Sequence, residues 1–341
     1  MKYKQNDIPY LGCNEQKIKQ ACPKLNYENF KHLHRWIIDR YHVHILKDIE
    51  KKPAPWTDNP IIQEYRFTNV RREHDKETQW VIHNICSIPE EDMSWASKIC
   101  NLILFRVVNK SETCKHFMPI NFDKGVDWNK ISSFVENLPS DYALFTNAFN
   151  TGGVKRAMCA SLGYISSYYD PISGVKPIYA VIQYIEKNVY YNEEFIQYLG
   201  NCVKASEFID ALQKLDGIGY FLAYQIFVDY TYCKEALWSE NEFVVAGPGA
   251  RRGLDLIFNN KDGMSYEECL FWLRDHWEDI CDFYRLPWNP DEIFTDLPEE
   301  DRYMNVMSLQ NCHCEISKYI RAITNTGRPR NKYHYREETN Q

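Results

Sequence analysis

Long apolar runs are missing from this chain of 341 residues. A helix that crosses a membrane needs about 18 or more consecutive apolar residues, and no stretch approaches that length. The first residues, MKYKQNDIPYLG, also lack the apolar core of a secretory signal peptide. We therefore expect no membrane span, no membrane partner and a cytoplasmic protein.

Cysteines paired at metal-site spacing are missing too. The 12 cysteines are scattered, and Cys312 and Cys314, with His313 between them, have no second pair that would complete a zinc site. The four-cysteine pattern of iron–sulfur DNA-repair enzymes is absent as well. In a cytosolic protein such cysteines are reduced and mostly buried. We predict no structural metal and no cofactor.

Segments that alternate apolar and polar residues, as strands do, are scarce and short. Apolar residues recur instead at helical spacing, as in residues 27–50 and 264–285. Hydrophobic residues make up 44% of the chain and aromatic residues 15%, which is enough for a substantial core. We predict a mostly α-helical protein with an N-terminal helical extension (1–50), one catalytic domain (51–325) and a basic polar tail (326–341).

An excess of basic residues is also lacking, since the formal net charge is −7. Nucleic-acid-binding proteins often carry a basic excess, so the charge argues mildly against that class. Phosphate contacts are local, however, and a basic groove can coexist with an acidic remainder. The charge therefore does not exclude a DNA-binding protein.

Residues 212–230, LQKLDGIGYFLAYQIFVDY, predict two helices joined by a tight turn. Gly217 and Gly219 flank Ile218, and glycine allows the positive φ and the close approach that such a turn requires. The N–H groups at the start of the second helix favour a phosphate, and Lys214 adds charge nearby. The pattern favours a DNA-contacting hairpin over an ordinary helical turn.

This pattern resembles the helix-hairpin-helix DNA glycosylases, which implies a glycosylase-like fold. Those enzymes carry a catalytic aspartate after the hairpin, and some carry a lysine just after its glycines. Here Ala246 and Phe221 stand at the matching positions, so both groups are absent. The segment AGPGARRG is found instead, and its Gly247, Gly249, Arg251 and Arg252 suit an anion. A plain glycine turn with two surface arginines is the alternative.

Four segments together resemble the alpha-glutamyl/putrescinyl thymine pyrophosphorylase family. Its members are also described as amino acid:DNA transferases and as the helical domain associated with 5-hydroxymethyluracil DNA kinases. The segments are PAPWTDNPIIQEYRFTNVRREHD (53–75), LDGIGYFLAYQIFVDY, VAGPGARRGLDLIF and SLQNCHCEISKYIRA (308–322). A kinase phosphate loop of the GxxxxGK(S/T) type is absent, so only the helical module is expected.

The resemblance implies a substrate, a partner and a setting. The substrate is double-stranded DNA with a thymine-like base that bears pyrophosphate on its 5-methyl carbon. The amine of an amino acid or polyamine displaces the pyrophosphate, and the base must be flipped out of the duplex. Members occur in viruses of bacteria, so the cytoplasm of a bacterial or virus-infected cell is expected.

Roles for individual residues follow from the resemblance and from their chemistry. Arg251 and Arg252, with the Gly247–Gly249 turn, would stabilise the leaving pyrophosphate, and Asp229 would orient or deprotonate the amine. Two further helix faces are predicted to line the substrate or phosphate site, with a solvated ion-pair face as the alternative. The residues on these faces are Arg66, Asn69, Arg71 and Asp75, and Asn311, Glu315, Lys318 and Arg321.

Two other functions remain open from the sequence. One is a DNA glycosylase that excises a bulky modified base, as a defence against viral DNA would require, with Asp229 or a water replacing the missing aspartate. The other is a DNA-binding module without catalysis. A glycosylase leaves abasic sites, a transferase leaves a heavier nucleoside and free pyrophosphate, and a binding module leaves neither.

Overall fold

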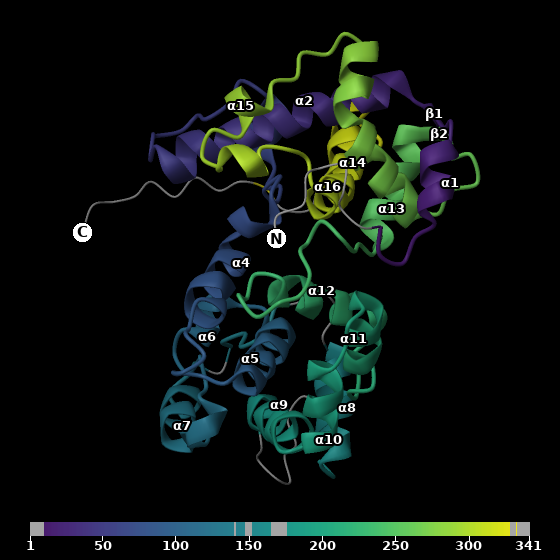
Figure 1. Ribbon diagram of the computed structural model, residues 1–341. Coiled ribbons are helices and arrows are strands. Elements are labelled where there is room, and N and C mark those ends of the chain that lie inside the picture. The colour runs from purple at the N-terminus through teal and green to yellow at the C-terminus, as the bar shows by residue number, and fades with distance from the viewer. Residues whose placement is uncertain (1–9, 140, 147–151, 165–175, 328–331, 333–341) are drawn as a thin grey trace. The chain divides into compact units, whose positions relative to one another are not determined.

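The fold is mostly α-helical, as the sequence predicted, and the chain forms two compact units (Figure 1). Unit 1 combines residues 1–75 with residues 240–341, and unit 2 consists of residues 76–239. The computed structural model describes residues 10–139, 141–146, 152–164, 176–327 and 332. None of the helices in these ranges has both the length and the apolar composition needed to cross a membrane.

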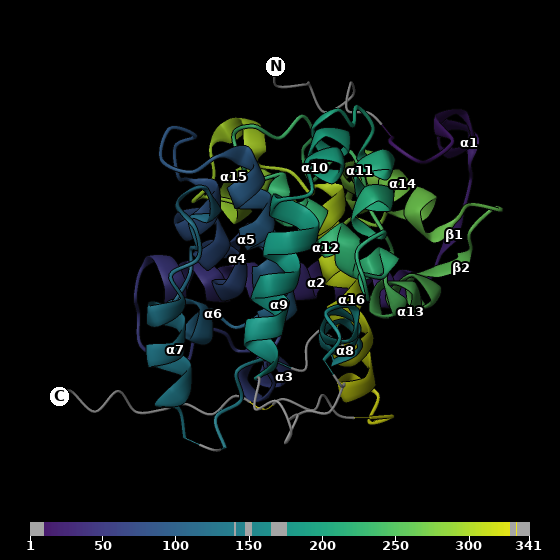
Figure 2. The same ribbon diagram turned by 90° about the horizontal axis from the view of Figure 1, so that it is seen from below.

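Unit 1 is built from helices and one short two-stranded ladder. Strands β1 and β2 pair antiparallel, with Leu25 opposite Phe258 (Figure 2). The elements of unit 1 are α1 (Glu15–Gln20), β1 (Lys24–Leu25), α2 (Tyr27–His44), the π-helical turn η2 (Ile45–Ile49), α3 (Pro60–Glu64), the 3₁₀ turn η3 (Arg72–His74), α13 (Pro248–Ile257), β2 (Phe258–Asn260), α14 (Tyr266–Phe283), α15 (Pro290–Ile293), η8 (Glu299–Asp301) and α16 (Val306–Ile323).

Helix α16 forms the centre of unit 1 and packs against α2, α3, α13 and α14. Its apolar residues Leu309, Cys312 and Ile316 are fully buried. The contact with α13 is very close, because a Cβ added to Gly253 would lie 2.0 Å from the His313 carbonyl oxygen. Only a residue without a side chain allows these two helices to approach so closely.

Replacing Gly253 with alanine is therefore expected to destabilise unit 1 by about 3 kcal/mol, because backbone atoms must move to admit the new carbon. Gly249→Ala, in the same interface, is the matched comparison. There the added Cβ would meet the Cys314 sulfur at 3.1 Å, and a side chain yields more easily than a backbone. Urea unfolding measures both variants, and equal losses of stability would contradict this account.

Helix α2 belongs to the core of unit 1. Its Phe30 ring packs on Trp277 of α14 at 5.2 Å between centroids, and Trp36 packs on Phe67 at 5.9 Å. The two-unit organisation therefore differs from the expected extension over 1–50 and single domain over 51–325. Long-range aromatic packing decides this difference, and helical periodicity carries no information about it. Most of the predicted tail lies outside the described residues.

Unit 2 is organised around a helix that is buried on all sides. Every residue of α5 from Ser97 to Val108 is buried, and α12 packs against it. The elements of unit 2 are α4 (Lys76–Val81), the π-helical turn η4 (Ile82–Cys86), α5 (Trp95–Val108), α6 (Ser111–Cys114), η5 (Phe122–Lys124), α7 (Trp128–Glu136), α8 (Gly152–Ser161), α9 (Pro177–Ile185), η7 (Glu186–Tyr190), α10 (Glu193–Gly200), α11 (Ala205–Leu212) and α12 (Tyr220–Tyr230).

Candidate functional site

Three of the four segments that suggested a function lie in unit 1. These are residues 53–75, 245–258 and 308–322, whereas the hairpin segment belongs to unit 2. Helix α16, from the last segment, contacts α3 and η3 of the first segment and α13 of the second. Unit 1 therefore gathers polar residues from distant parts of the sequence around one helix.

The loop before η3 is folded back on itself by Asn69 and Asp75. The Asn69 backbone N–H donates to Asp75 Oδ1 at 2.8 Å, and Asn69 Nδ2 donates to the His74 carbonyl at 2.6 Å. Asn69 is only 7% exposed. Its Oδ1 is buried and accepts no hydrogen bond from the described part of the chain. The loop thus presents a buried acceptor that has no donor.

Helix α16 brings two further polar side chains to this loop. Asn311 Nδ2 donates to the Asn69 carbonyl at 2.7 Å. Glu315, one turn later on the same face, is 3% exposed and accepts from Lys318 Nζ at 2.6 Å through Oε1. Its Oε2 is buried and, among the residues described, has no donor. We call Asn69, Asp75, Asn311 and Glu315 the acceptor cluster.

The electrostatics of the acceptor cluster are those of crowded carboxylates. Burial raises the pKa of Asp75 to about 6; Arg72 and the Asn69 N–H oppose this effect, and the charge of Glu315 adds to it. Glu315 and Asp75 are therefore close enough to interact. Phosphate is an acceptor only, whereas a primary ammonium offers three donors and a positive charge. Within the predicted substrate or phosphate site, the chemistry of this cluster suits an amine better than a phosphate.

The arginines that the sequence placed at this site, Arg71, Arg321 and Arg66, differ in their burial and in their contacts. Arg71 is buried and donates from Nε to Glu73 Oε1 at 2.6 Å and from a terminal nitrogen to the Tyr303 carbonyl at 2.9 Å. Arg321 donates to the Ser317 carbonyl at 3.1 Å. Arg66 is exposed. Arg71 therefore supports the fold locally through two strong contacts.

Glu73 and Glu240, which the sequence did not single out, accompany Arg71. Burial and the charge of Glu73 raise the pKa of Glu240 to about 7, and Arg71 opposes that shift. The Glu240 carboxylate also accepts from Asn305 at 3.1 Å. No local pattern marks Glu240, because it follows a turn far from Arg71 in the sequence.

The AGPGARRG segment forms the start of helix α13. Gly247 is its N-cap residue, and the Ala246 N–H just before it donates to Glu267 Oε1 at 3.0 Å. Gly249 faces Cys314, so its lack of a side chain serves packing against α16. The predicted phosphate turn is therefore helical from Pro248 onward, and a carboxylate already uses one of its N–H groups.

The two arginines of this segment are both exposed. Arg251 Nε donates to the Ala246 carbonyl at 2.8 Å, and its guanidinium lies 5.5 Å from the Tyr266 ring centroid. These contacts hold Arg251 against the start of its own helix. The exposed Arg252 follows it on the same surface helix and has the charge that an anion requires.

The hairpin in unit 2 has the turn that the sequence predicted. Gly217 has φ +78°, and a Cβ added there would lie 2.6 Å from Val154 Cα. Ile218 is 4% exposed and anchors the turn. Gly219 caps α12 and has open space around it. The ammonium of Lys214 lies over the Tyr198 ring at 4.3 Å.

Asp229 lies near the end of α12 and is completely buried. Both of its carboxylate oxygens accept from the guanidinium of Arg106 on α5, and Arg106 also donates to Asn109 at 3.0 Å. This pair joins two core helices of unit 2. The geometry does not favour the predicted catalytic role, because a carboxylate enclosed by its partner cannot reach an incoming amine.

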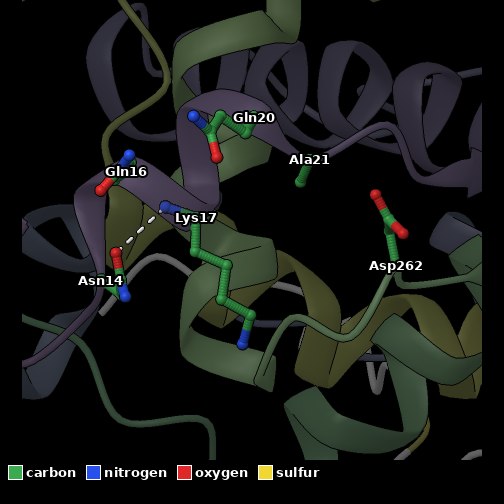
Figure 3. Close-up of a pocket in the computed structure, with 6 residues that line it drawn as sticks. All are labelled: Asn14, Gln16, Lys17, Gln20, Ala21 and Asp262. Atoms are coloured by element: carbon green, nitrogen blue, oxygen red, sulfur yellow. Dashed lines mark hydrogen bonds between the residues drawn. The ribbon is translucent and has the colours of Figure 1, made fainter.

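A shallow polar depression on unit 1 contains none of the predicted residues. It is lined by Asn14, Gln16, Lys17, Gln20, Ala21 and Asp262 (Figure 3). The Lys17 ammonium donates to Glu268 at 2.6 Å, so its charge is already compensated. This depression has no unsatisfied group comparable to those of the acceptor cluster.

Comparison with known proteins identifies the relatives of this chain. The family model described as "5-hmdU DNA kinase, helical domain" matches residues 27–328. A "5-hmdU DNA kinase" from Bacillus phage SP10 is 22% identical over 296 residues, which cover 83% of this chain and 44% of that protein. The chain thus spans less than half the length of this relative. No solved structure matches.

Proposed function

Because the chain belongs to the family of 5-hmdU DNA kinase helical domains, as its sequence predicted, we propose that it modifies a 5-substituted pyrimidine in DNA. In this proposal the amine of an amino acid or polyamine displaces pyrophosphate from the 5-methylene carbon of the base. Family membership supports DNA with a modified uracil as the substrate. The acceptor cluster of unit 1 is the observation that supports an amine as the second substrate.

The cluster meets the requirements for binding an amine. Asn69 Oδ1 and Glu315 Oε2 are buried acceptors without a donor in the described ranges, and such groups cost about 1–3 kcal/mol each when they stay unpaired. An ammonium supplies the missing donors, and the carboxylate of Asp75 compensates its charge, since Glu315 already pairs with Lys318 through Oε1. Binding the amine therefore relieves a cost that the free protein carries.

The displacement itself needs few groups. The amine nitrogen forms a bond to the methylene carbon, the carbon–oxygen bond breaks, and its electron pair leaves with pyrophosphate. The ammonium passes one proton to Asp75, which replaces the buried Asp229 in this role, before the nitrogen attacks; the secondary ammonium formed by the attack releases its second proton to water. Arg252, with Arg251 and the Gly247 turn, stabilises the leaving charge, and Lys318 and Arg321 extend this positive surface.

DNA binding is assigned to the hairpin of unit 2. The start of α12 at Gly219 is open, and the N–H groups there hold a backbone phosphate without reading sequence. Lys214 contributes positive charge. The hairpin would then hold the duplex while a base is flipped out of the stack.

The test uses synthetic DNA that carries 5-pyrophosphomethyluracil, incubated with the full chain and with or without a mixture of amino acids and putrescine. The expected products are a heavier nucleoside, detected by mass spectrometry, and free pyrophosphate, both only when amine is present. Release of a free base without amine would establish a glycosylase and overturn the transferase. Binding with no product would establish a DNA-binding module, with the same consequence.

A further inference from the structure

Two histidines and an aspartate converge in unit 1 next to the acceptor cluster, since His74 directly precedes Asp75. His44 is the last residue of α2, His74 the last of η3, and Asp296 lies between α15 and η8. The Nε2 atom of His44 lies 3.3 Å from Asp296 Oδ2, and the Nε2 atom of His74 lies 3.4 Å from the same oxygen. One potential ligand atom from each residue lies within 4.8 Å of the others.

The two separations from histidine nitrogen to carboxylate oxygen are those of a tetrahedral metal site. Zn²⁺ binds histidine nitrogen and carboxylate oxygen at about 2.1 Å, so two ligands at the tetrahedral angle lie about 3.4 Å apart. Both nitrogen-to-oxygen distances match this value. The two imidazole rings are stacked, with centroids 4.0 Å apart and planes 15° from parallel.

Surrounding residues already orient two of the three ligands, His44 and Asp296. Asp48, in the π-helical turn after α2, contacts His44 Nδ1 at 3.1 Å, and Tyr41 donates to Asp296 Oδ1 at 2.6 Å. Carboxylates on the far nitrogen of a histidine ligand are the usual outer partners in zinc sites, because they fix the ring and its tautomer. π-Helical turns are themselves common at functional sites.

From this geometry we propose that His44, His74 and Asp296 bind a Zn²⁺-like divalent ion, with water in the fourth position. Two imidazole nitrogens exclude Mg²⁺ and Ca²⁺, which prefer oxygen ligands. The side chains of His44, His74 and Asp296 are 7%, 9% and 10% exposed, so the site is enclosed but reachable. The charges of Asp296 and Asp48 balance that of the ion.

The bound ion would connect three segments that are remote in the sequence. It would join the end of α2 and the loop after α15 to η3, which is directly followed by Asp75. The ion would thereby stabilise the position of the loop that carries part of the acceptor cluster. This inference stands on the ligand geometry alone and does not depend on the proposed chemistry.

The full chain, stripped of metal with a chelator, is titrated with Co²⁺, whose visible absorption is strong in tetrahedral sites. One Co²⁺ per chain is expected, displaced by Zn²⁺, together with a Zn²⁺-dependent rise in the unfolding midpoint. His74→Gln and Asp296→Asn should abolish both signals. Asp48→Asn should weaken binding about 10- to 100-fold, as loss of an outer partner does.

His42→Gln is the matched control, because His42 is exposed on the same helix as His44 and should bind Co²⁺ like the unaltered chain. Circular dichroism verifies folding of each variant. Asp48, whose side chain is 37% exposed, provides a variant that folds even if the buried ligands do not tolerate change. Failure of the unaltered chain to bind Co²⁺, or unchanged affinity in Asp48→Asn and His74→Gln, would overturn the proposal.

Discussion

Replacing Asp229 with asparagine is expected to destabilise unit 2 by about 3–5 kcal/mol, the loss typical when one partner of a buried ion pair is removed. Asp229 is 0% exposed and Arg106 is 1% exposed, so the variant leaves the guanidinium buried without its counter-charge. Water cannot replace the lost carboxylate in this packed core. Urea unfolding of the two proteins, followed by circular dichroism, measures the difference.

Two comparisons separate this structural role from the catalytic role that the sequence predicted. Asp210→Asn, at an exposed position on α11 of the same unit, should change stability by less than about 0.5 kcal/mol. The double variant Arg106→Met with Asp229→Leu should recover much of the loss, since an apolar pair of similar volume often replaces a buried ion pair without cost. A stable Asp229→Asn protein with abolished turnover would restore the catalytic role.

Glu315→Gln is expected to raise the KM for the amine about 10- to 100-fold while leaving the affinity for DNA unchanged. The reason is that a charge-assisted hydrogen bond to a buried group contributes about 1.5–3 kcal/mol, and the variant removes the charge while keeping the shape. Steady-state kinetics with varied amine, and DNA binding measured separately, provide the two readouts.

The control for this prediction is Glu278→Gln on α14, an exposed position in the same unit, which should leave both quantities unaltered. If Glu315→Gln weakened DNA binding or pyrophosphate release and left the amine KM unchanged, the acceptor cluster would belong to the phosphate side of the reaction. The sequence left both the substrate and the phosphate side open, and the amine assignment would then be wrong.

The sequence by itself determined the helical class, the family and the hairpin. Each of these depends on local features. Helical periodicity reflects which faces of a segment are buried, and Gly217 marks a turn because few other residues tolerate its φ of +78°. The family resemblance rested on four short segments that follow one another along the chain in the family's order. That order can be read from the sequence whatever the arrangement of the segments in space.

Tertiary structure alone decided which polar groups meet and which are enclosed. Asp229 and Arg106 are 123 positions apart, so no local pattern shows that the core of unit 2 neutralises the predicted catalytic carboxylate. Gly253 resembles part of a phosphate motif until α16 is seen against it. The physical reason is the same for Asp229 and for Gly253: long-range packing determines which residues are buried and which residues they contact.

Long-range packing also explains why the sequence alone did not reveal the two sites of unit 1. Asn69 and Glu315 become acceptors without donors only after α16 packs against the loop before η3. His44, His74 and Asp296 carry no motif, because a metal site requires distances between atoms and not spacing along a chain. The sequence determined the helices, the turn and the family; packing decided which side chains are positioned for chemistry and which only support the fold.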